Sequence, residues 1–85
     1  MDIHDLVDSI KTKKDFDIFL EALLDNLRNN DSSWENNKLE NYVDAMYGFT
    51  KSLKGYYMHK KEDVDLDKPT WKMMATILIA ATHYE

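Results

Sequence analysis

The spacing of apolar side chains between residues 16 and 27 limits the fold more than any other feature of this sequence. Apolar residues recur there at intervals of three and four, at Phe16, Phe19, Leu20, Leu23, Leu24 and Leu27. This period matches an α-helix with one apolar face and not the alternation of a half-buried strand. The pattern therefore predicts a helix in which all six side chains, Leu20 and Leu24 included, face the core.

Similar spacing predicts three further helices, over about residues 2–10, 37–55 and 70–84. Two Gly and one Pro in 85 residues leave little of the turn chemistry that a multi-stranded sheet needs. The expected fold is therefore all-α, a compact bundle of about four helices in one domain that covers residues 1–85. The last helix is apolar almost all round, which predicts that it lies at the centre of the bundle or against another subunit.

Short polar residues predict where two of these helices begin. Thr12 precedes Asp15 by three residues, a spacing that resembles a capping box with Asp in place of Glu. Pro69 suits the first turn of the last helix, and either Asp67 or Thr70 is the expected cap.

The third helix is expected to begin at Asn37, with Glu40 completing a capping box. Gly55 is expected to end it in the left-handed conformation that glycine adopts readily. Its main apolar face is predicted to hold Leu39, Tyr42, Val43, Met46, Thr50 and Leu53.

Charge and cysteine content exclude several classes of protein. The net charge is −5, and it is uneven: residues 1–48 hold eleven acids and five bases (−6), whereas residues 49–85 hold five acids and six bases (+1). This acidity disfavours nucleic acid and acidic membranes and favours a basic protein partner. Without cysteine there is no disulfide and no thiolate zinc site. An acidic N-terminus and short apolar runs also disfavour a signal peptide and a membrane span, so we expect a cytoplasmic location.

The candidate binding site is an acidic row on the second helix. Asp17, Glu21 and Asp25 follow one another at i+4 steps, opposite the apolar face, and such like charges repel one another slightly. Ile18 adds an apolar contact beside them. These four residues are the expected contacts with a basic partner, which the charges would steer. The alternative is that the row only keeps the helix solvated.

The sequence contains no catalytic or metal-binding signature. Asp63, Asp65 and Asp67 alternate like the start of a calcium loop, but Lys68 and Met74 stand where that loop needs Gly and Glu. No Gly-x-Ser-x-Gly elbow or phosphate-binding loop is present. We therefore expect a protein that is not an enzyme and that has no metal and no cofactor.

The three histidines are the remaining candidates for chemistry. His4 lies four residues before Asp8, which could orient its ring, while His59 and His83 are distant in sequence. A cavity that gathered His4, His83 and acidic side chains would favour a small enzyme, and that alternative stays open.

Four short motifs follow one another along the chain. They are Trp34-Glu35-Asn36, Gly55-Tyr56-Tyr57, Pro69-x-Trp71 and Ala80-Ala81-x-x-Tyr84-Glu85. Over about residues 16–85 the chain thereby resembles a family of small bacterial domains without an established function, and this resemblance implies no catalytic residue. In size and charge the chain also resembles the immunity proteins that neutralise bacterial toxins, an analogy and not a motif.

Two functions follow as expectations. The first is a non-enzymatic acidic domain that binds a basic protein, such as a toxin domain that it neutralises. The second is a structural or regulatory homodimer, in which the additional apolar surface of the third and fourth helices faces a second copy.

Overall fold

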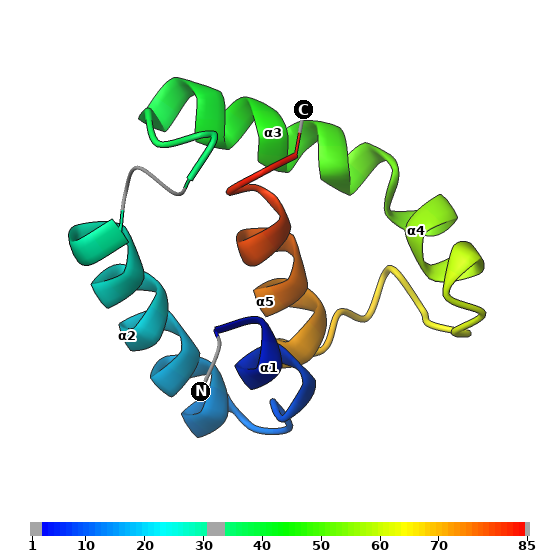
Figure 1. The fold of residues 1–85 in the computed structure, drawn as a ribbon. Helices are drawn as coiled ribbons and strands as arrows, with labels where there is room; N and C mark the ends of the chain where they lie inside the picture. Colours follow the sequence, from blue (N-terminus) through cyan, green and yellow to red (C-terminus); the bar gives the residue numbers. More distant parts are fainter. Residues whose placement is uncertain (1–2, 31–33, 85) are drawn as a thin grey trace.

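The computed structural model of the chain describes residues 3–30 and 34–84. Within these ranges the protein has five helices and no strand, so the predicted all-α class is confirmed. The helices are α1 (Ile3–Asp8), α2 (Lys13–Asn30), α3 (Leu39–Lys51), α4 (Leu53–His59) and α5 (Trp71–Ala80) (Figure 1). None of them combines the length and the apolar character that crossing a bilayer requires.

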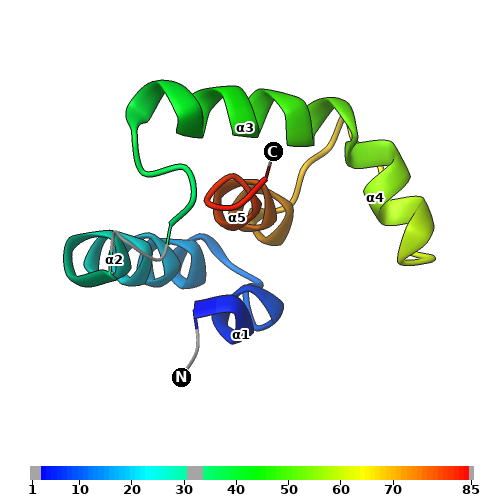
Figure 2. The ribbon, with the colours of Figure 1, turned by 45° about the horizontal axis from the view of Figure 1, so that its top comes forward.

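Helix α5 lies between α3 on one side and the α1–α2 pair on the other (Figure 2). It contacts α1, α2 and α3, while α4 packs on α3. Among the residues that the structure describes, α2 and α3 each pack against α5 and not against each other. These contacts are compatible with the central position predicted for the last helix.

The third predicted helix is divided into two at Ser52. Helix α3 ends at Lys51, and α4 continues past Gly55 to His59. Gly55 is therefore inside a helix, and the prediction that it adopts a left-handed conformation is wrong. The break allows Leu53 and Tyr57 to turn into the core, where both are buried. The left-handed residue is instead Lys61, with φ of 60°, after α4 has ended.

The caps of two helices agree with the sequence. The backbone N–H of Asp15 donates to Thr12 Oγ1 at 3.2 Å, and Asp15 Oδ2 accepts from the N–H groups of Lys11 and Thr12 at 3.0 and 3.3 Å. This reciprocal arrangement is a capping box. At α5, Met73 N–H donates to Thr70 Oγ1 at 3.0 Å. The cap of α3 differs from expectation, because Lys38 and not Asn37 occupies the N-cap position, without a side-chain hydrogen bond.

The Asp15 carboxylate makes the stability of the fold depend on pH. Its hydrogen bond from the Lys11 backbone is the main cause that holds the pKa below the ordinary value of 3.8. A carboxyl whose pKa is lowered on folding stabilises the fold above its unfolded pKa, and this contribution is lost as the pH falls through the folded pKa. We therefore expect Asp15→Asn to lower the urea midpoint at pH 7, with the difference from the natural protein shrinking below about pH 4.

The matched control for this change is Asp25→Asn, which removes the same charge from the exposed middle of α2. It should leave the urea midpoint almost unchanged at both pH values. Equal effects of the two substitutions would show that net charge, and not the capping box, accounts for the loss.

The core consists of two clusters of buried side chains that share α5. The first joins α1, α2 and α5 and holds Val7, Ile10, Phe16, Phe19, Leu23, Trp34 and Ala75. The second joins α3, α4 and α5 and holds Phe49, Leu53, Tyr57 and Met73. The side chains of Phe19 and Ala75 are fully inaccessible to solvent. Helix α5 therefore supplies a buried side chain to both clusters, which makes it the element that joins them.

Only part of the apolar face of α2 is buried. Phe16, Phe19 and Leu23 are buried, but Leu20 and Leu24 are 39% and 45% exposed, so the prediction that both face the core is wrong. The face is wider than the elements that cover it, because among the described helices α2 packs against α1 and α5 alone. Within residues 3–30 and 34–84, no helix packs against the flank that carries Leu20 and Leu24.

Only part of the face predicted for the third helix is buried: Tyr42 is half-buried against the core and Leu53 is buried, whereas other members of that face are exposed. The buried residues of α3 are Ala45 and Phe49, whereas Leu39 and Val43 are 80% and 52% exposed. The Phe49 ring packs edge-on against Tyr56 and Tyr84, with ring centroids 5.2 and 5.5 Å apart. This aromatic cluster turns the helix so that Phe49 faces inward. The predicted row Leu39, Val43 and Thr50 consequently faces solvent.

Candidate functional site

The acidic row predicted on α2 lies on the exposed surface. We call Asp17, Glu21 and Asp25 the acidic ridge. Asp17 forms an ion pair with Lys13, with 2.7 Å between Oδ2 and Nζ, and both side chains remain more than half exposed. The side chains of Glu21 and Asp25 make no hydrogen bond or ion pair with the residues that the structure describes. Ile18, the apolar residue predicted beside them, is 51% exposed. All four residues are therefore accessible to a partner.

An apolar groove of about 400 Å³ lies between α2 and the start of α3. One wall comes from α2, and the other comes from the loop before α3 and from its first turn. We call it the apolar groove. It is lined by Leu20, Leu23, Leu24, Leu27, Trp34, Asn36, Asn37, Lys38, Leu39 and Tyr42. Its volume lies within the range of ligand-binding sites in proteins, and its surface is mainly apolar.

Two aromatic residues hold the groove together. The Trp34 indole N–H donates to Asn26 Oδ1 at 2.7 Å, and its ring lies 5.6 Å from the Tyr42 ring in a stacked arrangement. The Tyr42 hydroxyl donates to the Leu78 carbonyl oxygen of α5 at 2.8 Å, and burial raises the pKa of this hydroxyl. These bonds join α2, α3 and α5 beneath the groove. Leu20, Leu24 and Leu39 remain exposed at its edges.

The acidic ridge follows one edge of this groove. Asp17 precedes Leu20 by three residues, and Glu21 precedes Leu24 by three. Residues three apart on a helix are neighbours on its surface. Asp17 and Glu21 therefore border the exposed leucines of the groove and do not, as the sequence predicted, lie opposite the whole apolar face. None of the three carboxylates lines the groove itself, and Asp25 has no groove leucine at this spacing.

The Trp34-Glu35-Asn36 motif fastens the loop before α3 to the end of α5. Asn36 Nδ2 donates to the carbonyl oxygens of Ala81 and Tyr84, at 3.0 and 2.8 Å. The Asn36 backbone N–H donates to the Thr82 carbonyl oxygen at 3.0 Å. These bonds satisfy carbonyl groups after the last turn of α5. The motif thus has a structural role in addition to lining the groove.

The other motifs also supply packing contacts. Trp71 of the Pro-x-Trp motif lies 5.3 Å from the Phe16 ring. Tyr84 packs closely on Gly48. A Cβ atom on residue 48 would lie 3.0 Å from Tyr84 Cε2, so the absence of a side chain at Gly48 allows this approach. Trp71 and Tyr84 therefore contribute packing contacts.

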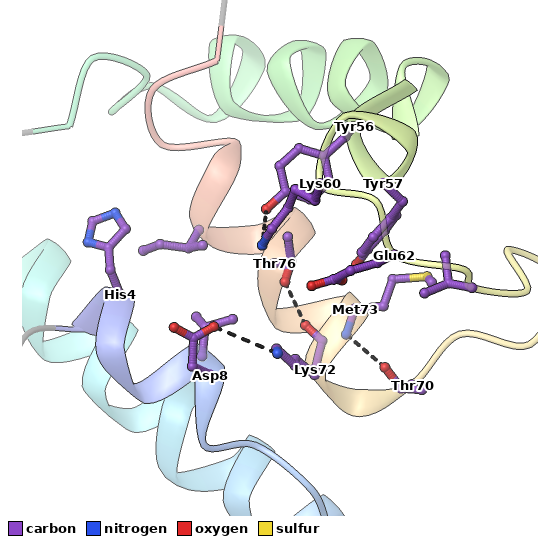
Figure 3. Close-up of a pocket in the computed structure, with 13 residues that line it drawn as sticks. His4, Asp8, Tyr56, Tyr57, Lys60, Glu62, Thr70, Lys72, Met73 and Thr76 are labelled. Carbon is purple, nitrogen blue, oxygen red and sulfur yellow. Dashed lines mark hydrogen bonds and ion pairs between the residues drawn. The ribbon is translucent and has the colours of Figure 1, made fainter. Parts of the chain in front are cut away.

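A second, smaller cavity of about 200 Å³ lies between α1, α4 and α5. Figure 3 shows His4 and Asp8 reaching it from α1, Tyr56 and Tyr57 from α4, and Lys72 and Thr76 from α5, with Lys60 and Glu62 beside them. Its lining therefore mixes both signs of charge with hydroxyl groups and apolar side chains.

The polar groups of this cavity mostly contact one another. Lys72 Nζ lies 3.7 Å from Asp8 Oδ1. Lys60 Nζ donates to the Tyr56 hydroxyl at 3.4 Å, and this hydrogen bond is the main cause that raises the pKa of Lys60. The Thr76 hydroxyl donates to the Lys72 carbonyl oxygen at 2.9 Å. Burial raises the pKa of the Tyr57 hydroxyl. The polar groups are largely paired with one another, and the arrangement does not single out one acid or base.

The histidines are distributed over the molecule. His4 lines the small cavity, whereas His59 ends α4 and His83 follows α5, and neither of these two lines that cavity. In the described part of the chain no three histidine or acidic side chains come close enough together to hold a metal ion. In the connector after α4, Asp65 Oδ1 accepts a hydrogen bond from the Asp67 backbone N–H at 2.9 Å.

Sequence reasoning found the ridge but missed the groove. A usable signal was present, because the apolar face of α2 is wider than one packed neighbour can cover. A second signal was Leu39 in the first turn of the next helix, directly after the polar loop.

The chain belongs to the DUF7660 family, a family of unknown function, whose model matches residues 12–85. The match includes helices α2 to α5 and therefore both the acidic ridge and the apolar groove. It agrees with the resemblance to a family without an established function that the sequence motifs indicated. No curated protein and no solved structure matches the chain.

Proposed function

We propose that this protein is a non-enzymatic binding domain that recognises a basic protein through the acidic ridge. The observation that carries the proposal is the position of the exposed ridge, in which Asp17 and Glu21 neighbour leucines that line an apolar groove. Apolar contact supplies most of the free energy of protein association, and complementary charge supplies on-rate and specificity. In this proposal α5 is the central support, because it contacts both α2 and α3.

More specifically, we propose that the protein inhibits a basic toxin domain by binding to it. A stoichiometric inhibitor needs a stable scaffold and a charged surface that covers a basic active site or imitates its anionic substrate. The small size, the net charge of −5 and the concentration of acids in residues 1–48 support this role.

A titration against a basic partner tests the proposal. The partner to use is the purified product of the gene next to the one that encodes this protein. We expect binding that weakens with added salt, since exposed charges are screened. Changing Asp17, Glu21 and Asp25 to Lys should weaken binding roughly tenfold or more, because each contact turns from attraction to repulsion.

The matched control changes Asp63, Asp65 and Asp67 to Lys. It alters the net charge by the same amount on the exposed connector between α4 and α5. Equal losses in both variants would show a general effect of charge and not a site on α2. Unchanged affinity in the ridge variant would remove this surface from the proposal.

A homodimer is the second candidate, and one observation favours it. Leu39, Val43 and Tyr47 are all more than half exposed and lie at i+4 steps along α3, so they form an apolar row that no described helix covers. Sedimentation velocity at micromolar concentration separates the two candidates. A dimer that Val43→Gln dissociates would support the second, and a strict monomer would reject it.

A further inference from the structure

We infer that the apolar groove binds an amphipathic α-helix of the partner that carries lysine or arginine along one side of its apolar stripe. This inference rests on the protein-binding function proposed above and adds the secondary structure and the chemistry of the segment that binds.

The shape of the groove suits a helix. Its long wall is α2, from Leu20 to Leu27, which corresponds to about two helical turns or roughly 10 Å. The opposite wall is Leu39, whose apolar surface continues along α3 to Val43 and Tyr47. A helix that lies in a groove is anchored by apolar side chains at i, i+3 or i+4, and i+7, a spacing of similar length.

The base of the groove is already formed. Trp34 and Tyr42 are fixed by hydrogen bonds to Asn26 and to the Leu78 carbonyl oxygen. A partner therefore has to order few side chains in the base when it binds, which lowers the entropic cost of association. Leu20, Leu24 and Leu39 at the edges are the side chains that gain most burial.

Charge complementarity selects the partner. Asp17 and Glu21 each lie one turn from an exposed leucine of the groove, so a helix in the groove has carboxylates along its α2 side. Asp17 is paired with Lys13, and Lys38 lines the opposite wall, so the basic side chains of the partner belong on the side of Glu21. Basic side chains next to its apolar stripe would meet these carboxylates. A second copy of this chain would bring the same acidic edge near the groove, and an anionic membrane would be repelled, so charge favours a basic helix over both.

Defined peptides test the inference on the full chain. The first probe is a labelled peptide of about 18 residues with leucine at helical spacing and lysine on both flanks. The second has glutamate in place of every lysine, and the third has the composition of the first with the leucine period scrambled. Fluorescence anisotropy should show that only the first peptide binds appreciably.

Variants then locate the site. Leu24→Gln and Leu39→Gln should each weaken binding of the first peptide about tenfold, because an apolar contact is lost while the net charge is kept. The matched control is Met58→Gln on α4, an apolar residue that is 67% exposed and distant in sequence from the groove, and it should leave affinity unchanged. Circular dichroism of each variant checks that the helices remain.

The two indoles provide a second measurement. Trp34 lines the groove, whereas Trp71 packs on Phe16 outside it. In a heteronuclear NMR titration with the first peptide, the Trp34 Nε1–H signal should shift and the Trp71 signal should stay in place. Equal shifts of both signals would contradict binding in the groove.

The outcomes separate this inference from the proposed function. Failure of the first peptide to bind, or equal binding of the scrambled peptide, rejects the helix-in-groove inference. Binding that ignores both leucine variants but falls with Asp17→Asn and Glu21→Gln rejects the groove and keeps the acidic surface. Equal binding of the lysine and glutamate peptides, with loss in the leucine variants, keeps the groove and rejects the preference for a basic partner.

Discussion

Phe19→Ala should lower the free energy of unfolding by about 3–5 kcal/mol, the largest loss expected from one side chain in this protein. The Phe19 ring is fully buried in the cluster that α1, α2 and α5 form, and its centroid lies 6.2 Å from the Phe16 ring. Removing it leaves a cavity that neighbouring side chains fill only in part. Since small domains are stable by only about 5–15 kcal/mol, urea unfolding should show a clear fall in the midpoint.

The neighbouring residue provides the control for this change. Ile18 is in the same helix but is 51% exposed, so Ile18→Ala should change the unfolding free energy by less than about 1 kcal/mol. A similar loss in both variants would mean that burial does not determine the effect, because alanine has a higher helix propensity than either residue. It would also contradict the orientation of α2 described above.

Asn36→Ala should lower the free energy of unfolding by about 2 kcal/mol, because two hydrogen bonds of about 1 kcal/mol each are lost. The side-chain amide donates to the carbonyl oxygens of Ala81 and Tyr84, and alanine leaves both without this donor. Asn36→Asp should be at least as harmful, since a carboxylate cannot donate to a carbonyl oxygen. Urea unfolding measures both variants.

Asn41→Ala is the matched control, because Asn41 is exposed within α3. It should be nearly neutral, and alanine even favours a helix. Native-state hydrogen exchange adds a local measurement: in Asn36→Ala, amides at the end of α5 should exchange faster relative to those in the middle of α2. Equally faster amide exchange throughout the chain would argue against a local role of Asn36 in stabilising the end of α5.

The helices and their caps could be predicted where the information is local. The apolar period over residues 16–27 identifies α2, and the spacing of Thr12 and Asp15 identifies its first turn, because both depend on neighbours within one or two turns. The end of α3 could not be predicted in this way. Gly55 often ends a helix, but here the burial of Leu53 and Tyr57 determines the path of the chain.

The orientation of α3 depended on information from distant parts of the sequence. Its apolar residues surround more than half of the helix, so the pattern alone allows several faces to be turned inward. Contacts of Phe49 with Tyr84 and of Gly48 with the same ring select one of them. These residues are more than thirty positions apart, beyond the reach of periodicity.

In the candidate site, too, local features could be predicted from the sequence and features that depend on packing could not. The acidic ridge is readable because three carboxylates at i+4 steps must share one side of a helix. The wide apolar face of α2 and Leu39 indicate that apolar surface is left over, but they do not place the groove, because it exists where α2 and α3 both pack on α5 and leave a space between them. Surfaces made by a single helix can be predicted from sequence, whereas surfaces made by two require knowledge of their packing.

The position of α5 has a consequence for how this protein is made. Helices α1, α2 and α3 precede α5 in the chain, yet each of them packs on it. During synthesis, Phe19 and Phe49 therefore emerge from the ribosome well before the surface that covers them. Because both core clusters include residues of α5, we expect most of the core to assemble only after residue 80 has emerged from the ribosome.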